Sequence, residues 1–189
     1  MMTGKPMKLI KTKINDLFVL EPKVFEDNRG YFFESYNKKR LDDLIGKSYN
    51  FVQDNESKSS YGVIRGLHYQ LEPYSQAKLV RVLHGTVYDV AVDIRKDSPT
   101  FGEWVGVELS ATNKKQFLIP KGFAHGFSVL SETAIFAYKC DEYYHPEAES
   151  GIVYDDPTLN IDWKIKNEDM IVADRDRNWP KLENVKTRP

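Results

Sequence analysis

The sequence has only one cysteine. Cys140 is alone among 189 residues, so no disulfide can form within the chain. The first residues do not have the pattern of a signal peptide, and no apolar run approaches the roughly 20 residues that cross a bilayer. These absences predict a protein of a reducing, cytoplasmic compartment that has no membrane partner.

The sequence also lacks an excess of either charge. Lys and Arg total 27, against 28 Asp and Glu. This balance provides no general attraction for nucleic acid or for an anionic membrane, so we expect neither partner, and an anionic ligand must be bound by a local group of basic residues. The length indicates a single domain over 1–189, in which 1–7 is a disordered start or one added for expression and 157–189 wraps around the exterior.

Helical periodicity is scarce as well. One short amphipathic helix is predicted over about 38–45, with Asn37 as its N-cap and Gly46 as its C-terminal stop. Elsewhere, short aromatic and β-branched segments alternate with Gly, Pro and Asn turns, and strands favour the aromatic residues that make up 13% of the chain. The pattern predicts an all-β sandwich or barrel with short peripheral helices.

The clearest strand pattern lies between residues 79 and 95. Two apolar segments, 79–83 and 87–95, flank His84-Gly85-Thr86, which predicts a β-hairpin. Within the second segment, alternation separates Val90 and its apolar neighbours from Asp89 and other polar residues. We expect the polar face to meet either solvent or a cleft.

Histidine pairs with the spacing of metal ligands are missing. The four histidines are His68, His84, His125 and His145, and none forms a His-x-His or His-x-x-x-His pair. Pro120-x-Gly122-x-x-His125 resembles the second motif of the cupin barrels, but the paired histidines and the glutamate of their first motif are not present. We therefore expect no catalytic metal, with a metal-dependent cupin enzyme as the alternative.

The best candidate for chemistry is His68, in Arg65-Gly66-Leu67-His68-Tyr69-Gln70. Imidazole is the side chain best suited to proton transfer near neutral pH, although a single His in a strand is also explained as a hydrogen-bonded structural residue. A base of this kind removes a proton α to a ketone when a carboxylate orients it and a phenol returns a proton to the other face. Tyr138 is the candidate phenol, and Tyr143 and Tyr144 compete with it.

A second candidate is an anion pocket formed by Arg29, Arg65, Lys78 and Arg81. The guanidinium of an arginine can donate two parallel hydrogen bonds to phosphate oxygens, and the ammonium of a lysine acts as a point charge. The alternative is that these residues lie on a solvated barrel surface. Side chains that could stack on a base or hydrogen-bond to it are Phe25, Phe32, Glu34, Gln53 and Asn55.

Six segments, in their order and spacing, resemble the dTDP-4-dehydrorhamnose 3,5-epimerase family. They are Asp27-Asn28-Arg29-Gly30, Phe51-Val52-Gln53-Asp54-Asn55, Arg65 to Gln70, Lys78-Leu79-Val80-Arg81, Val87 to Arg95 and Gly122-Phe123-Ala124-His125-Gly126-Phe127. The resemblance extends from about Leu9 to Trp179. It implies a cupin-like double-stranded β-helix (jelly roll) and a homodimer with shared active sites. It also implies metal-free, cofactor-independent epimerisation at C3 and C5 of dTDP-4-dehydro-6-deoxy-D-glucose, in dTDP-rhamnose biosynthesis.

The resemblance also implies roles for individual residues. His68 matches the family's catalytic base, Tyr138 its catalytic acid, Lys78 the residue near the developing C4 oxyanion, and His125 a residue that contacts the sugar. Two further sets concern the nucleotide. Arg65 and Gln53 match nucleotide or diphosphate contacts, and Phe25, Arg29, Phe32 and Glu34 lie in the segment that reaches the nucleotide, partly from the second subunit.

The aspartate that orients the base is less well defined by sequence. The family usually has Ser-x-x-Asp here, whereas this chain has Ala173-Asp174-Arg175-Asp176, without the serine. Spacing selects Asp176, and Asp174 is the alternative. Without the serine hydroxyl, the sequence does not identify the group that holds this carboxylate in place. Two other functions also stay open: a 3-epimerase that inverts one carbon only, and a nucleotide-sugar binding module without catalysis.

Overall fold

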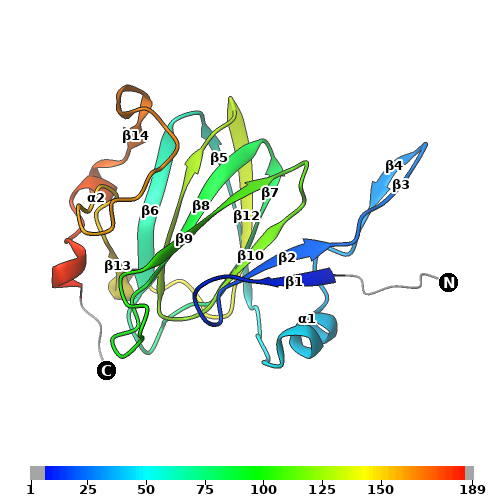
Figure 1. The fold of residues 1–189 in the computed structure, drawn as a ribbon, viewed down its shortest axis with the longest axis horizontal. Coiled ribbons are helices and arrows are strands. Elements are labelled where there is room, and N and C mark those ends of the chain that lie inside the picture. The colour runs from blue at the N-terminus through cyan, green and yellow to red at the C-terminus, as the bar shows by residue number, and fades with distance from the viewer. Residues whose placement is uncertain (1–6, 186–189) are drawn as a thin grey trace.

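The computed structural model describes residues 7–185. Of the predicted start over 1–7, only Met7 lies within the described residues, and it begins strand β1 (Met7–Lys11). Two antiparallel sheets face each other and enclose the core, with short helices at the periphery (Figure 1). This arrangement confirms the predicted all-β jelly roll. No helix of the described residues is long and apolar enough to cross a membrane.

The first sheet has six strands in the order β1-β2-β10-β7-β12-β5. Besides β1, its strands are β2 (Phe18–Pro22), β10 (Gln116–Ile119), β7 (Lys78–His84), β12 (Thr133–Cys140) and β5 (Gln53–Ser60). Strand β12 pairs with β7 on one side and with β5 on the other, so residues from positions 53–60, 78–84 and 133–140 lie side by side.

The second sheet runs in the order β13-β6-β11-β8-β9. Its strands are β13 (Glu149–Gly151), β6 (Val63–Gln70), β11 (Phe123–Val129), β8 (Thr86–Asp93) and β9 (Trp104–Ser110). A short strand, β14 (Ile171–Val172), pairs with β6 in parallel at Val63 and Ile64, while β13 pairs with the other end of β6. The edge of β6 therefore has a break between its two partners.

The predicted hairpin between residues 79 and 95 is wrong, although both strands are present. Strand β7 pairs with β10 and β12, and β8 pairs with β11 and β9, so the two strands lie in opposite sheets. Val80 and Val82 of β7 and Val87 and Ala91 of β8 bury the same core from two sides. The chain crosses between the sheets at Gly85, whose φ is 76° and where a Cβ would lie 2.1 Å from the carbonyl oxygen of Thr133.

The predicted helix is confirmed as α1 (Lys38–Ile45). The side chain of Asn37 accepts a hydrogen bond from the backbone N–H of Arg40 at 3.1 Å, and Gly46 ends the helix in the left-handed conformation. A separate two-stranded hairpin is formed by β3 (Phe25–Asp27) and β4 (Gly30–Phe32). The remaining peripheral elements are single helical turns: α2 (Asp174–Arg177) and the 3₁₀ turns Pro146–Ala148, Asn167–Asp169 and Leu182–Asn184.

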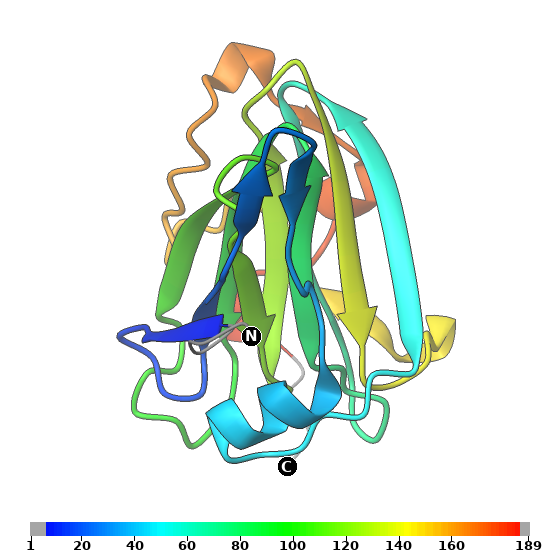
Figure 2. The same ribbon diagram turned by 90° about the vertical axis from the view of Figure 1, so that its right-hand side faces the viewer.

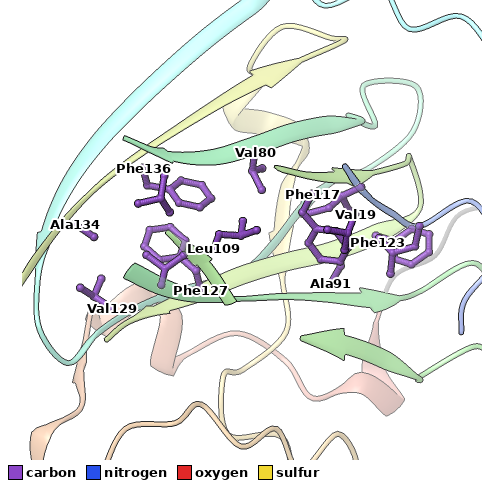
Figure 3. Packing of buried hydrophobic residues seen from close by; sticks show 14 of the residues in the cluster. Val19, Val80, Ala91, Leu109, Phe117, Phe123, Phe127, Val129, Ala134 and Phe136 are labelled. Carbon is purple, nitrogen blue, oxygen red and sulfur yellow. The ribbon is translucent and has the colours of Figure 1, made fainter. Parts of the chain in front are cut away.

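Aromatic and aliphatic side chains from both sheets fill the interior (Figure 3). Phe127 and Phe136 stack with ring centroids 4.3 Å apart, which joins the second sheet to the first. The ring of Phe136 also packs against two polar aromatic side chains, His125 and Tyr138, each at 6.0 Å. The polar aromatic side chains of the interior therefore pack directly against the apolar core.

Residues 157–185 cover the outer face of the second sheet. Trp163, Val172 and Leu182 are buried there against Ile64 and Val92. In Figure 1 this orange and red segment runs along the outside of β6. It brings the turn α2 to the break between β13 and β14, and this placement positions a side chain for the site.

Candidate active site

His68 of β6 forms a hydrogen bond with Asp176 of α2. The distance from Nε2 of His68 to Oδ1 of Asp176 is 2.7 Å, and the backbone N–H of Gly66 donates to Oδ2 at 3.1 Å. Asp176 enters through the break along β6 and is 2% exposed. Asp174 is exposed at the start of the same turn, so Asp176 is the aspartate that contacts His68.

The Asp176 carboxylate has two contacts besides His68. Besides the Gly66 N–H, Nε of Arg175 lies 3.5 Å from Oδ1. Burial raises the pKa of Asp176, but the hydrogen bond and charge of His68, the Gly66 N–H and the charge of Arg175 outweigh it and hold the pKa below its ordinary value. An ionised Asp176 only accepts hydrogen bonds, so Nε2 of His68 is the donor in this pair and Nδ1 is the ring nitrogen that does not bond to Asp176.

Lys78 and Tyr138 lie on the first sheet, opposite His68. Alternation along β7 and β12 points them inward with the core residues Val80 and Phe136. The Nζ atom of Lys78 lies 5.9 Å from the centroid of the Tyr138 ring, and Lys78 forms no ion pair with the described residues. Its ammonium is thus free to meet a substrate oxygen.

Burial sets the protonation of both groups. It lowers the pKa of Lys78 below the ordinary value, against the opposing effects of Cys140, Asp89 and Glu149. Burial raises the pKa of Tyr138, and the charge of Arg65 only partly offsets this. The phenol therefore keeps its proton at neutral pH and is suited to act as a proton donor.

A second His–Asp pair adjoins the first. His125 of β11 is directly opposite His68 in the pairing of β11 with β6, and paired residues of neighbouring strands point to the same face. Nε2 of His125 lies 3.0 Å from each carboxylate oxygen of Asp89. Burial raises the pKa of Asp89, with His125 and Lys78 opposing it.

Asp89 was not among the candidate residues from sequence. Its signal was the alternation over 87–95, which predicts a polar face that meets solvent or a cleft. The structure decides between these, because Val87 and Ala91 on the same face of β8 belong to the buried core. Asp89 itself is fully buried, so the face lines the interior.

Gln53, Asn55 and Arg65 surround Tyr138. Asn55 of β5 pairs with Tyr138, and its Nδ2 lies 3.8 Å from the sulfur of Cys140. The side chain of Gln53 donates to Oδ1 of Asn55 at 3.0 Å and accepts from the backbone N–H of Tyr144 at 3.0 Å. Nε of Arg65 donates to the hydroxyl of Ser59 at 3.1 Å. These contacts bring three predicted substrate-binding residues to one side of the Lys78 and Tyr138 pair.

Four other predicted residues lie elsewhere within the chain. Phe25, Arg29 and Phe32 belong to the β3–β4 hairpin, which stands on the outer side of the first sheet, away from β6 (Figures 1 and 2). Arg29 is exposed and pairs with Asp27 at 2.6 Å. Glu34 pairs with Arg40 of α1 at 2.9 Å. The structure of one chain does not bring this group to His68.

Arg81 is separated from Lys78 by the first sheet. The two residues are three apart on β7, so their side chains point to opposite faces. Arg81 lies 5.9 Å from the Phe33 ring and lines an outer cleft of about 300 Å³ together with Ser35, Asp54, Gln116 and Lys139. Its inclusion in an anion pocket with Lys78 and Arg65 is therefore wrong.

The two inner histidines are each paired with an aspartate. Among residues 7–185, no group of three or more His, Cys, Asp and Glu side chains has the arrangement of a metal site. Each of the two inner histidines instead faces one aspartate. The jelly-roll barrel, with a His–Asp pair on one sheet and an ammonium and a phenol on the other, has the arrangement expected of a cupin-like epimerase.

Comparison with known proteins identifies the family. The family model described as dTDP-4-dehydrorhamnose 3,5-epimerase matches residues 11–184, and the chain belongs to this family of isomerases. It is 56% identical over 176 residues to the dTDP-4-dehydrorhamnose 3,5-epimerase of Shigella flexneri, covering 93% of this chain and 96% of the relative.

Solved structures show the same fold. The dTDP-4-dehydrorhamnose 3,5-epimerase of Elizabethkingia anophelis NUHP1 has a TM-score of 0.91 and 56% identity, covering 95% of this chain and 98% of that chain. The dTDP-6-deoxy-D-glucose-3,5-epimerase of Legionella pneumophila Philadelphia 1, in complex with dTDP-4-keto-L-rhamnose, has a TM-score of 0.91 and 54% identity, covering 95% of each chain.

Proposed function

We propose that this protein inverts C3 and C5 of dTDP-4-dehydro-6-deoxy-D-glucose without a cofactor and gives dTDP-4-dehydro-L-rhamnose for dTDP-rhamnose biosynthesis. The observation that carries the proposal is the His68–Asp176 pair on one sheet with Lys78 and Tyr138 on the other. The ligand of the Legionella relative, dTDP-4-keto-L-rhamnose, is the product expected here.

The proposed chemistry uses the C4 ketone. A hydrogen on C3 or C5 is α to that carbonyl, so Nδ1 of His68 can remove it as a proton. The electron pair of the C–H bond then forms a double bond to C4, and the π pair of the carbonyl moves to the C4 oxygen. The Lys78 ammonium stabilises the resulting enolate oxygen. Tyr138 then donates its proton to the same carbon from the opposite face, and the carbonyl re-forms. Exchange with solvent then removes the proton from His68 and returns one to the Tyr138 phenolate, and the same steps invert the second carbon.

Solvent exchange tests the function directly. Incubation of the protein with dTDP-4-dehydro-6-deoxy-D-glucose in deuterated water should place deuterium at both C3 and C5, measured by proton NMR and mass spectrometry. Both positions exchange because each proton transfer passes through groups that equilibrate with solvent. Deuterium at C3 alone would identify a single-carbon 3-epimerase. Absence of deuterium at both carbons would refute epimerisation and leave a binding module.

We further propose a homodimer in which the β3–β4 hairpin of each subunit reaches the nucleotide site of the other. In support, the hairpin extends from the outer side of its own barrel and exposes large aromatic side chains: Tyr31 is 57% and Phe32 is 62% exposed. Phe25, Arg29 and Phe32 can thereby serve a second chain, while Gln53, Asn55, Arg65 and His125 serve their own.

Mixing two inactive variants tests this sharing. One variant is His68→Ala, and the other carries Arg29→Ala with Phe32→Ala. Their mixed dimer has one site with both an intact base and an intact hairpin, so a statistical mixture should recover roughly a quarter of the wild-type kcat/KM. No recovery after subunit exchange, or a monomer by light scattering, would contradict the shared site.

A further inference from the structure

The residue Trp179 lies beside the catalytic base and has no role in the mechanism given above. Its ring centroid is 6.3 Å from that of His68, and the two planes meet at 71°, an edge-to-face arrangement. Trp179 follows Asp176 by three residues. One short C-terminal segment therefore makes two contacts with His68: the Asp176 carboxylate hydrogen-bonds to Nε2, and the Trp179 indole packs against the imidazole ring.

The indole occupies the place of a missing side chain. Gly151 of β13 is directly opposite His68 in the pairing of β13 with β6, so a side chain at 151 would lie next to the imidazole. A Cβ at this position would be 2.7 Å from both Cδ1 and Cδ2 of Trp179. The glycine thus allows the indole to approach the backbone and to fill the space beside His68.

Hydrogen bonds hold the backbone around the indole but not the indole itself. Val153 donates its backbone N–H to the carbonyl of Pro180 at 3.0 Å, next to Trp179. Trp104 and Trp163 donate their indole N–H groups to the carbonyls of Leu159 and Tyr154. The indole N–H of Trp179, by contrast, is buried and has no partner among the described residues. Ring packing therefore determines its place.

We propose that Trp179 is a positioning residue for His68, and this inference rests on the proposed function. Asp176 determines which nitrogen carries the proton, and the indole limits rotation of the imidazole about its Cβ–Cγ bond. With both contacts, Nδ1 keeps a single direction toward the substrate carbon. General-base catalysis is sensitive to such alignment, since small displacements of a reacting group cost large factors in rate.

Replacement of Trp179 by leucine tests the role. Trp179→Leu keeps an apolar side chain but removes the ring, and we expect kcat for epimerisation to fall about tenfold while KM stays within about twofold. Trp179→Phe restores a ring and should recover kcat to within about threefold of the wild type. The control is Trp104→Phe, which removes an indole hydrogen bond far from His68 and should lower the melting temperature without lowering kcat.

A double-mutant cycle separates positioning from general stability. With Asp176→Asn the imidazole has already lost its alignment, so adding Trp179→Phe or Trp179→Leu should cost much less than in the wild-type background. If Trp179→Leu does not fold, the cycle with Trp179→Phe provides the test. Additive losses, an unchanged kcat in Trp179→Leu, or a change in KM alone would each overturn the inference.

The same measurements distinguish this inference from the function on which it rests. If the unaltered protein places no deuterium at C3 or C5, the proposed function fails and the positioning role fails with it. If the unaltered protein exchanges both positions and Trp179→Leu exchanges them at the same rate, only the role of Trp179 is refuted.

Discussion

His68→Ala is expected to abolish deuterium incorporation at both C3 and C5 and to lower kcat by about 10²–10⁴-fold, the usual contribution of a general base. Among the described residues, His68 is the only histidine that hydrogen-bonds to Asp176. Removal of the imidazole therefore leaves no base at that position. Because the side chain of His68 is partly exposed and is not part of the apolar core, its truncation should leave the barrel folded. Exchange is measured by NMR, with circular dichroism as the check on folding.

The matched control for this variant is His84→Ala. His84 is exposed at the end of β7 and is not among the side chains that line the interior, so its replacement should leave the exchange rate unchanged. Retention of exchange in His68→Ala would mean that another group is the base. His125 would then be the next candidate, since it is paired with Asp89 directly across from His68.

Lys78→Met is expected to lower kcat by about 10²–10³-fold, the usual loss when one donor to a developing oxyanion is removed. Methionine keeps most of the length and volume of the lysine stem but has no charge. The control is Lys139→Met on β12, because Lys139 pairs with Asp54 on the outer face of the same sheet. An equal loss of kcat in both variants would show that the effect is not specific to the interior.

The activity should also depend on pH through Lys78. Burial places the pKa of Lys78 below its ordinary value of 10.5. The ammonium is the active form, so activity is present below the lowered pKa and is lost as the pH rises through it. Lys78→Arg keeps the charge to higher pH and should shift this alkaline limit upward, although guanidinium geometry reduces kcat. A limit that does not move would assign it to another group.

Much of the site was recognisable from local sequence. The alternation over 87–95 identified a polar strand face, and Asn37 and Gly46 marked both ends of α1. The family resemblance singled out His68, Lys78 and Tyr138, and the structure brings Lys78 and Tyr138 within 5.9 Å of each other. Local patterns succeed here because strand alternation and helix capping depend on neighbouring residues.

Other features depended on contacts between distant segments. The hairpin predicted around His84-Gly85-Thr86 is wrong because a turn sequence does not specify whether two strands share a sheet, and here the chain crosses at Gly85. Arg81 was grouped with Lys78, but the parity of β7 places the two on opposite faces. Asp89 was missed because its burial depends on how the two sheets close over the core.

By itself, the sequence determined the β-rich class and the helix α1, since both follow from composition and periodicity, and the family resemblance named His68 and Tyr138 as candidates for the acid–base side chains. Only the tertiary structure decided that Asp176 and not Asp174 contacts His68, that the backbone N–H of Gly66 donates to the Asp176 carboxylate, and that Trp179 lies against His68. These contacts join residues about 110 positions apart, as the Gly66–Asp176 hydrogen bond does. They exist because the C-terminal segment packs over the second sheet and enters the break along β6, and no local pattern encodes that packing.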